Sequence, residues 1–208
     1  MVNEFVGICL GVASLYNSCH DINNQAYSRQ TLHAVFLYRL VMSLNIVKAT
    51  INDSRNIMEL IKSCILNMES VGIYQWNEYY PTLDIIMSDV ESGSLYVLKE
   101  GNDIWGIIVI NEDQSPEYRN LSWGDEGKVL VVHRLAVQPN KQRTGIAKKL
   151  MDFAEIYAKE KEFTSIRLDT YSGNPIAMTL YEQRGYIRVG QVYFPMRELP
   201  FNCYEKVL

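Results

Sequence analysis

Apolar positions recur with two different periods between residues 44 and 208, and this pattern predicts the elements of one layered domain. Short β-branched or alternating runs predict strands at residues 44–49, 95–99, 104–110, 129–138, 165–170, 186–193 and 203–207. Apolar stripes at helical spacing predict helices at residues 57–68, 83–90, 145–161 and 175–184. Hairpin-like turns force antiparallel neighbours, whereas the helix between the fourth and fifth strands permits a parallel pair. We therefore expect an α/β (α+β) fold, with a central mixed sheet of about six to seven strands flanked by helices.

Residues 129–150 join an apolar strand, a short turn and the start of a helix. Pro139 ends the strand, and the small residues Gly145 and Ala147 stand where the helix begins. The first amides of a helix have no intrahelical partner and the helix dipole is positive there, so this arrangement predicts an anion cradle. The single glycine fits neither the dinucleotide fingerprint nor the P-loop. An ordinary strand-to-helix turn is the alternative.

The pattern Gln-x-x-Gly-x-Ala at residues 142–147, after a strand that ends in Leu-Ala-Val at residues 135–137, resembles the acyl-CoA signature of the GNAT superfamily of N-acetyltransferases. The resemblance covers residues 42–208. It implies a three-layer GNAT-like fold, acetyl-CoA as co-substrate and no metal. It also implies that the loop amides hold the pyrophosphate and that the Leu135 amide polarises the thioester carbonyl, which needs a fixed N–H donor. The residues expected to bind the cofactor are Leu135, Ala136, Val137, Gln142, Arg143, Thr144, Gly145, Ile146, Ala147, Lys148, Asn174 and Tyr181.

Asn174 and Tyr181 lie seven residues apart, so they share a face of the last predicted helix. The resemblance implies that Asn174 contacts the cofactor and that Tyr181 protonates the departing thiolate. Asn174 also suits the N-cap of this helix, ahead of Pro175, and the two roles are compatible. Core packing is the alternative for Tyr181, and a solvated helix start is the alternative for Arg143 and Lys148.

The general base has no clear match to the family pattern. Relatives that modify histones carry a glutamate four residues before the position of Leu135, where this chain has Val131. Strand alternation would place Val131, His133 and Leu135 on one face. His133 is then the candidate base, because an unperturbed imidazole titrates near neutrality. A hydrogen-bonded structural histidine is the alternative, and the reserve candidates are Glu126, Asp169 and Tyr171.

The resemblance implies that the aromatic loop before the second helix borders the acceptor site, and an acidic loop is a second candidate. The aromatic loop before the second helix contributes Trp76, Tyr79 and Tyr80, which either line a pocket or plug the end of the core. The acidic loop at residues 111–127 either attracts an ammonium group or is a solvated surface loop. The residues expected to bind the acceptor are Trp76, Tyr79, Tyr80, Trp123, Glu126, Asp169 and Tyr171.

Composition narrows the partners and the compartment. The net charge is −4 and no region carries a block of Lys and Arg, so we expect no nucleic-acid partner. The four cysteines and three histidines are too scattered for a metal site, and a reduced cytoplasmic setting fits best. Residues 1–41 are expected to be an extension outside a catalytic domain at 42–208, or a helical arm that packs on it or on a second subunit. The apolar run at residues 5–16 is shorter than a membrane span, so no membrane partner is expected.

The leading interpretation is an N-acetyltransferase that moves the acetyl group of acetyl-CoA directly to an amine of a small molecule, peptide or protein. No cysteine stands beside a base in the signature region, so no covalent enzyme intermediate is implied. A non-catalytic acyl-CoA-binding or sensing module is the alternative, and succinyl-CoA is an alternative donor. The C-terminal strands offer an edge for a homodimer.

Overall fold

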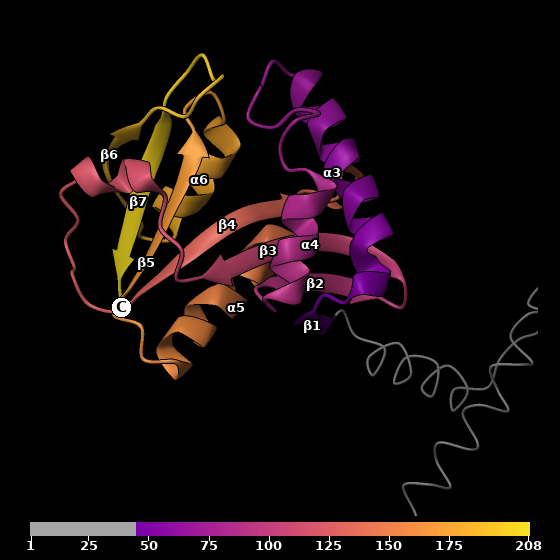
Figure 1. Ribbon diagram of the computed structural model, residues 1–208, viewed down its shortest axis with the longest axis horizontal. Helices are drawn as coiled ribbons and strands as arrows, with labels where there is room; N and C mark the ends of the chain where they lie inside the picture. Colours follow the sequence, from indigo (N-terminus) through magenta and orange to yellow (C-terminus); the bar gives the residue numbers. More distant parts are fainter. Residues whose placement is uncertain (1–44) are drawn as a thin grey trace, which may run out of the picture. The chain divides into compact units, whose positions relative to one another are not determined.

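The computed structural model describes residues 45–208, which form a seven-stranded mixed sheet with helices on both faces (Figure 1). The strand order is β1-β2-β3-β4-β5-β7-β6. The strands are β1 (Asn45–Lys48), β2 (Leu95–Glu100), β3 (Asp103–Asn111), β4 (Val129–Val137), β5 (Ser165–Tyr171), β6 (Ile187–Val192) and β7 (Phe201–Val207). The α-helices are α3 (Ser54–Glu69), α4 (Leu83–Glu91), α5 (Ile146–Glu160) and α6 (Pro175–Gln183), and the 3-10 turns are η2 (Ile51–Asp53), η3 (Pro116–Asn120) and η4 (Pro139–Lys141). The expected fold class is confirmed, whereas the boundary at Met42 and the extension at residues 1–41 lie outside the described residues.

Buried side chains on both faces of the central strands explain why these strands are apolar almost throughout. In β3, Ile107 and Val109 pack with α3 and α4, while Ile108 and Ile110 pack with α5. Residues of α6 join the α5 side, including Tyr181. The sheet therefore separates an α3–α4 layer from an α5–α6 layer, which is a three-layer arrangement.

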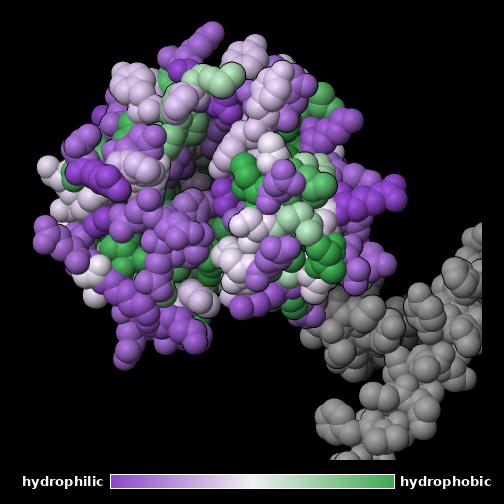
Figure 2. Space-filling view, in the orientation of Figure 1, coloured by the Kyte–Doolittle hydropathy of each residue, from purple (hydrophilic) through white to green (hydrophobic). Residues whose placement is uncertain are grey.

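The parallel pair β4–β5 is hydrogen-bonded along only part of its length. Pairing begins at Val129 and Ser165 and stops at Val132 and Leu168, although both strands continue beyond this point. The last five residues of β4 therefore have β3 on one edge and no strand of the described chain on the other. Figure 2 shows the surface drawn inward between the α3–α4 side and the β5–β7 side.

A β-bulge lies in β4 where this separation begins. His133 pairs with Val109 and Ala136 pairs with Ile107, so Arg134 and Leu135 together face one residue of β3. Arg134 adopts the left-handed conformation, with φ of 43°. The extra residue reverses the alternation, so the sequence-based placement of Leu135 on the face of Val131 is wrong. Leu135 packs with the α5 cluster, whereas Val131 belongs to a cluster on the opposite face.

A buried ion pair holds the bulge against α4. The Arg134 guanidinium donates from Nε and Nη2 to the two carboxylate oxygens of Asp89, at 2.7 and 2.6 Å. Its Nη1 donates to the Tyr80 hydroxyl at 3.0 Å. A left-handed conformation costs a non-glycine residue about 1–2 kcal/mol, so this bidentate contact offsets a strained backbone. The loop before α4 and the bulge of β4 are thus tied together.

We predict that Asp89→Asn lowers the free energy of unfolding by about 3 kcal/mol, because it leaves the Arg134 charge buried without a counter-charge. Denaturant unfolding at pH 7 measures this loss. Glu59→Gln is the control, since it breaks the exposed Arg55–Glu59 pair of α3 and should cost about 0.5 kcal/mol or less. Equal small losses of unfolding free energy in the two variants would contradict the stabilising role of the Asp89–Arg134 pair.

Candidate active site

The turn between β4 and α5 presents backbone amides without side-chain caps. Gly145 is the N-cap of α5, with φ of 87°, and no side chain caps the first amides of the helix. A Cβ at Gly145 would meet no heavy atom within 4 Å, so the space beside this residue is open. Thr144 Oγ1 donates to the Lys141 carbonyl at 2.6 Å and Gln142 Nε2 to the Val137 carbonyl at 3.3 Å. These bonds fix the turn, and uncapped amides at a helix start are groups that bind anions in proteins. Anion binding at this turn stays a prediction.

Tyr181 lies on α6, in the hydrophobic cluster on the α5 side of the sheet. It is 6% exposed, and its ring lies 6.0 Å from those of both Tyr186 and Tyr204. Burial and the charge of Asp169 raise the pKa of Tyr181. Within residues 45–208 its hydroxyl makes no hydrogen bond, and it is protonated at neutral pH. Tyr181 is therefore a buried residue with a protonated hydroxyl, and its role as an acid stays a prediction.

Asn174 is the N-cap of α6, and this sequence-based expectation is confirmed. Its Oδ1 accepts from the Ala177 amide at 3.1 Å. Its Nδ2 donates to Gln75 Oε1 at 2.9 Å, and the Gln75 carbonyl accepts from Arg197 Nε at 3.2 Å. The Asn174 amide thus connects α6 with the loop between α3 and α4, while its contact with a cofactor stays a prediction.

Asp169 occupies the first β5 position beyond the last β4–β5 pair. The Tyr118 hydroxyl, from η3, donates to Asp169 Oδ2 at 2.5 Å. Asp169 is half-buried, and the burial of its carboxylate raises the pKa to about 6 despite this hydrogen bond. Arg134 acts in the opposite direction through its charge and lowers this pKa. A carboxyl group with this pKa exchanges protons close to neutral pH.

The separated ends of β4 and β5 leave a gap between the two strands. His133 lies on β4, across this gap from Asp169, and is neutral. Its Nε2 is 2.9 Å from Asn111 Oδ1. Burial and the neighbouring Arg134 charge lower the pKa of His133 to about 4. The ordinary imidazole pKa assumed from the sequence does not apply here, so the ring retains little capacity to take up a proton at pH 7.

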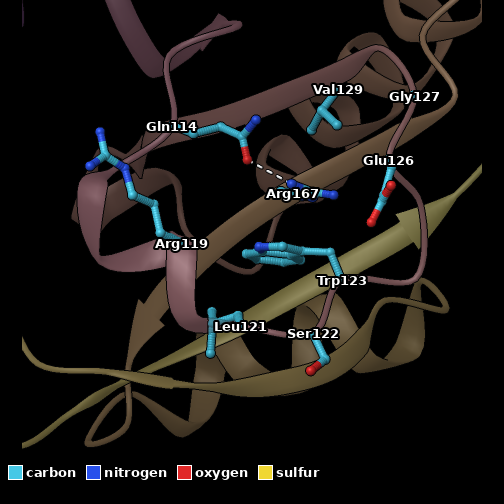
Figure 3. Close-up of a pocket in the computed structure, with 9 residues that line it drawn as sticks. All are labelled: Gln114, Arg119, Leu121, Ser122, Trp123, Glu126, Gly127, Val129 and Arg167. Carbon is cyan, nitrogen blue, oxygen red and sulfur yellow. Dashed lines mark hydrogen bonds between the residues drawn. The ribbon is translucent and has the colours of Figure 1, made fainter.

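A hollow of about 570 Å³ opens under the loop between β3 and β4. Arg167 forms its floor: Nε donates to Glu205 and Nη1 to Gln114 Oε1, at 2.9 and 2.7 Å. The guanidinium lies 4.2 Å above the Trp123 ring, and Figure 3 shows Gln114 and Trp123 on opposite sides of it. Arg167 therefore has a structural role, and the polar groups at the floor of the hollow already have hydrogen-bond partners.

Residues 56–186 match the model of the Acetyltransferase (GNAT) family. The chain belongs to this family. It is 27% identical to the uncharacterized N-acetyltransferase YesJ of Bacillus subtilis over 146 residues, which are 68% of this chain and 81% of YesJ. A GNAT-family acetyltransferase structure from Streptococcus agalactiae aligns with a TM-score of 0.67 at 22% identity, over 79% of this chain and 95% of that one. The PaiA N-acetyltransferase of Thermoplasma acidophilum, solved in complex with coenzyme A, aligns with a TM-score of 0.59 at 16% identity, over 80% and 99% of the two chains.

Membership in the GNAT family makes the protein an acyl-CoA-dependent acyltransferase. Within residues 45–208 no cluster of His, Cys, Asp and Glu has the geometry of a metal site, and no helix is long and apolar enough to cross a membrane. Cys64 and Cys203 are both buried free thiols.

The residues expected to contact the acceptor divide into three groups. Tyr80 and Asp169 lie at the gap, where both interact with Arg134. Trp76 and Tyr171 are buried in two different hydrophobic clusters, with exposures of 7% and 3%. The burial of Trp76 favours the interpretation that it plugs the end of the core. The burial of Tyr171 leaves it almost no exposed surface with which to contact an acceptor.

The remaining acceptor candidates are Tyr79, Trp123 and Glu126. Tyr79 is 68% exposed. Trp123 and Glu126 line the hollow, and Trp123 Nε1 donates to the Tyr118 carbonyl at 3.1 Å. Their contact with an acceptor stays a prediction.

Sequence reasoning missed Tyr118 and Arg134. Tyr118 lies in an irregular loop, where no periodicity indicates which side chain turns inward. Arg134 did carry a signal, because a charged residue within an almost unbroken apolar strand needs a buried partner. That signal does not identify Asp89, which is 45 residues away in the chain.

We predict that the His133 imidazole titrates at about pH 4 in the folded protein, as followed by NMR with His133→Gln to assign the signal. The ordinary pKa is 6.5, so the unfolded chain binds more protons between the two values. The free energy of unfolding should therefore fall as the pH drops from about 6.5 to about 4, with a smaller slope in the variant. Titration of the folded imidazole near pH 6.5 would contradict the burial argument.

Proposed function

We propose that this protein transfers the acetyl group of acetyl-CoA directly to an amine. The observation that carries the proposal is the combination of two features: the edge of β4 that no strand of the described chain pairs with, and the start of α5 that no side chain caps, which follows β4 after the η4 turn. The coenzyme A bound to the related PaiA fold supports the same ligand class. Acyl-CoA has a diphosphate for the cradle and a strand-like amide arm for the open edge.

The cradle residues fit the diphosphate because the amides from Thr144 to Ala147 stand at the positive end of the α5 dipole. Arg143 and Lys148 add positive charge at the same end of the helix. Pairing of the pantetheine arm with the backbone of Leu135 to Val137 is supported by the lack of a strand of the described chain along this edge of β4. Gln142 supports this arrangement by fixing the turn rather than by direct contact.

The reaction needs a donor for the developing oxyanion and an acid for the leaving thiolate. A backbone amide at the open edge, assigned to Leu135, stabilises the negative charge on the thioester oxygen. The Tyr181 hydroxyl remains protonated and supplies a proton to the thiolate. The acceptor is an amine of a small molecule or peptide. The acidic groups around the gap favour a cation over an anion at that position.

Three expectations about the compartment and the partners of the protein accompany this proposal. Buried thiols at Cys64 and Cys203 fit a reducing compartment such as the cytoplasm. The net charge of −4 argues against nucleic acid as a partner. The free edge of β6 would serve a homodimer, which light scattering can measure.

We predict that Gly145→Ala weakens coenzyme A binding at least 10-fold in titration calorimetry, because the added methyl group enters the open space beside the cradle. Gly101→Ala is a matched control, since Gly101 also has positive φ and open space but lies in the β2–β3 turn. Both changes should cost about 1 kcal/mol of stability. Equal affinity in the two variants, or no binding by the unaltered protein, would refute the cradle.

We also predict that Tyr181→Phe lowers kcat about 100-fold while leaving coenzyme A affinity nearly unchanged. Thiol release from acetyl-CoA is followed with spermidine, L-lysine, an aminoglycoside and a peptide with a free N-terminus. Tyr193→Phe, at a tyrosine that is 68% exposed, is the control. Binding of coenzyme A without thiol release from acetyl-CoA or succinyl-CoA would indicate the sensing module instead.

A further inference from the structure

We infer that Asp169 is the proton acceptor for the amine, and that Tyr118 positions its carboxylate. This inference rests on the proposed acetyl transfer and assigns the one group in it that the family pattern leaves open. It moves the base from β4 to β5.

The position of Asp169 follows from the sheet register. Val131 pairs with Arg167, so His133 and Asp169 stand two residues further along, on the same face, where the strands have parted. A carboxylate at this position borders the gap between β4 and β5. It adjoins the stretch of β4 that the proposed function assigns to the thioester.

One carboxylate oxygen of Asp169 is held and the other is free. Oδ2 accepts from Tyr118, and within residues 45–208 Oδ1 has no hydrogen-bond partner and the carboxylate no ion pair. Asp89 provides the contrast, because both of its oxygens are taken by Arg134. Of these two carboxylates, only the half-buried Asp169 has an oxygen free to receive a proton.

The groups that face Asp169 come from four neighbouring elements. They are Glu117 and Tyr118 on η3, Arg134 on β4, Tyr181 on α6 and Cys203 on β7, with His133 across the gap. Tyr118 and Tyr181 are neutral because burial and the Asp169 charge raise the pKa of each. Burial and the same charge raise the pKa of Cys203 to about 12, so this thiol is neutral too. Arg134 is the cation of this group, and Asp89 already neutralises it.

Asp169 is better suited to the proton transfer than His133. Its pKa of about 6 lies two pH units above the value of about 4 for His133, so it binds a proton about 100-fold more strongly. It is nevertheless mostly ionised at pH 7, which a base requires.

The proton and electron balance closes within these groups. The neutral amine forms a bond to the thioester carbon, and the carbonyl π electrons move to oxygen. The nitrogen, now positively charged, gives its proton to Asp169. The oxygen electrons then reform the carbonyl and the carbon–sulfur bond breaks. The thiolate takes a proton from Tyr181, which recovers one from Asp169 or solvent.

Asp169→Asn should lower kcat/KM at least 100-fold at pH 7.5 for whichever panel amine the unaltered protein acetylates, with coenzyme A affinity within about 2-fold. The rate of the unaltered protein should fall as the pH drops through about 6, because the base becomes protonated, and the variant should lose this acid limb. Asp84→Asn, an exposed carboxylate on α4, is the matched control and should change neither measurement. Asp169→Glu should recover part of the rate.

Tyr118→Phe tests the positioning role separately. The hydrogen bond from Tyr118 lowers the pKa of Asp169, so its removal should move the acid limb to higher pH while the aromatic ring keeps its packing against Trp123. A purely structural role would lower the rate at every pH without moving the limb.

Thermal unfolding shows whether the Asp169 variant is folded. The folded pKa lies above the ordinary 3.8, so ionisation of Asp169 destabilises the fold as the pH rises through about 6. Asp169→Asn should therefore raise Tm at pH 8, and the gain should disappear below about pH 4. Undiminished turnover of Asp169→Asn with its acid limb intact overturns the inference alone. Absence of turnover by the unaltered protein with every amine overturns the proposed function and the inference together.

Discussion

The separation of β4 from β5 is the constraint on which the rest of the structure depends. A parallel pair normally continues as long as both strands last, because each backbone group gains a hydrogen bond. Here pairing ends at Val132 and Leu168, and the strained Arg134 bulge starts two residues after Val132. Asp89 clamps that bulge from α4. The fold thus leaves backbone groups of β4 without partners inside the described chain, which is useful only if a ligand takes them.

Environment gives three neighbouring titratable groups different chemistry. Burial raises the pKa of Asp89 too, but Arg134 opposes this rise through its charge and its hydrogen bonds to both carboxylate oxygens, so Asp89 acts as a structural counter-charge. Asp169 meets a neutral hydroxyl, so burial dominates and its pKa rises to about 6. His133 meets an amide oxygen and lies beside a cation, which lowers its pKa to about 4. The assignment of acid and base therefore depends on the partner of each group and not on its residue type.

The sequence was sufficient to predict the periodic secondary structure and the local motifs. Strand and helix periods, the N-cap at Asn174 and the strand-turn-helix of the cradle are local features, and local patterns identify them. Prediction failed where an inserted residue in a strand changes the face on which every later residue of that strand lies. The bulge at Arg134 reversed the faces of β4, so Leu135 could not be placed by alternation. Tyr118 could not be found because its contact with Asp169 spans 51 residues and starts in an irregular loop.

Amide hydrogen exchange with and without coenzyme A tests the central claim most directly, because it measures whether the unpaired backbone amides gain hydrogen-bond partners. The account predicts slower exchange in two segments at once, residues 133–137 of β4 and residues 144–148 at the start of α5. Segments of β2 and β7 should exchange unchanged. Protection confined to other parts of the chain, or no change in either segment at saturating coenzyme A, would contradict the claim that the opened edge of β4 and the start of α5 form one binding surface.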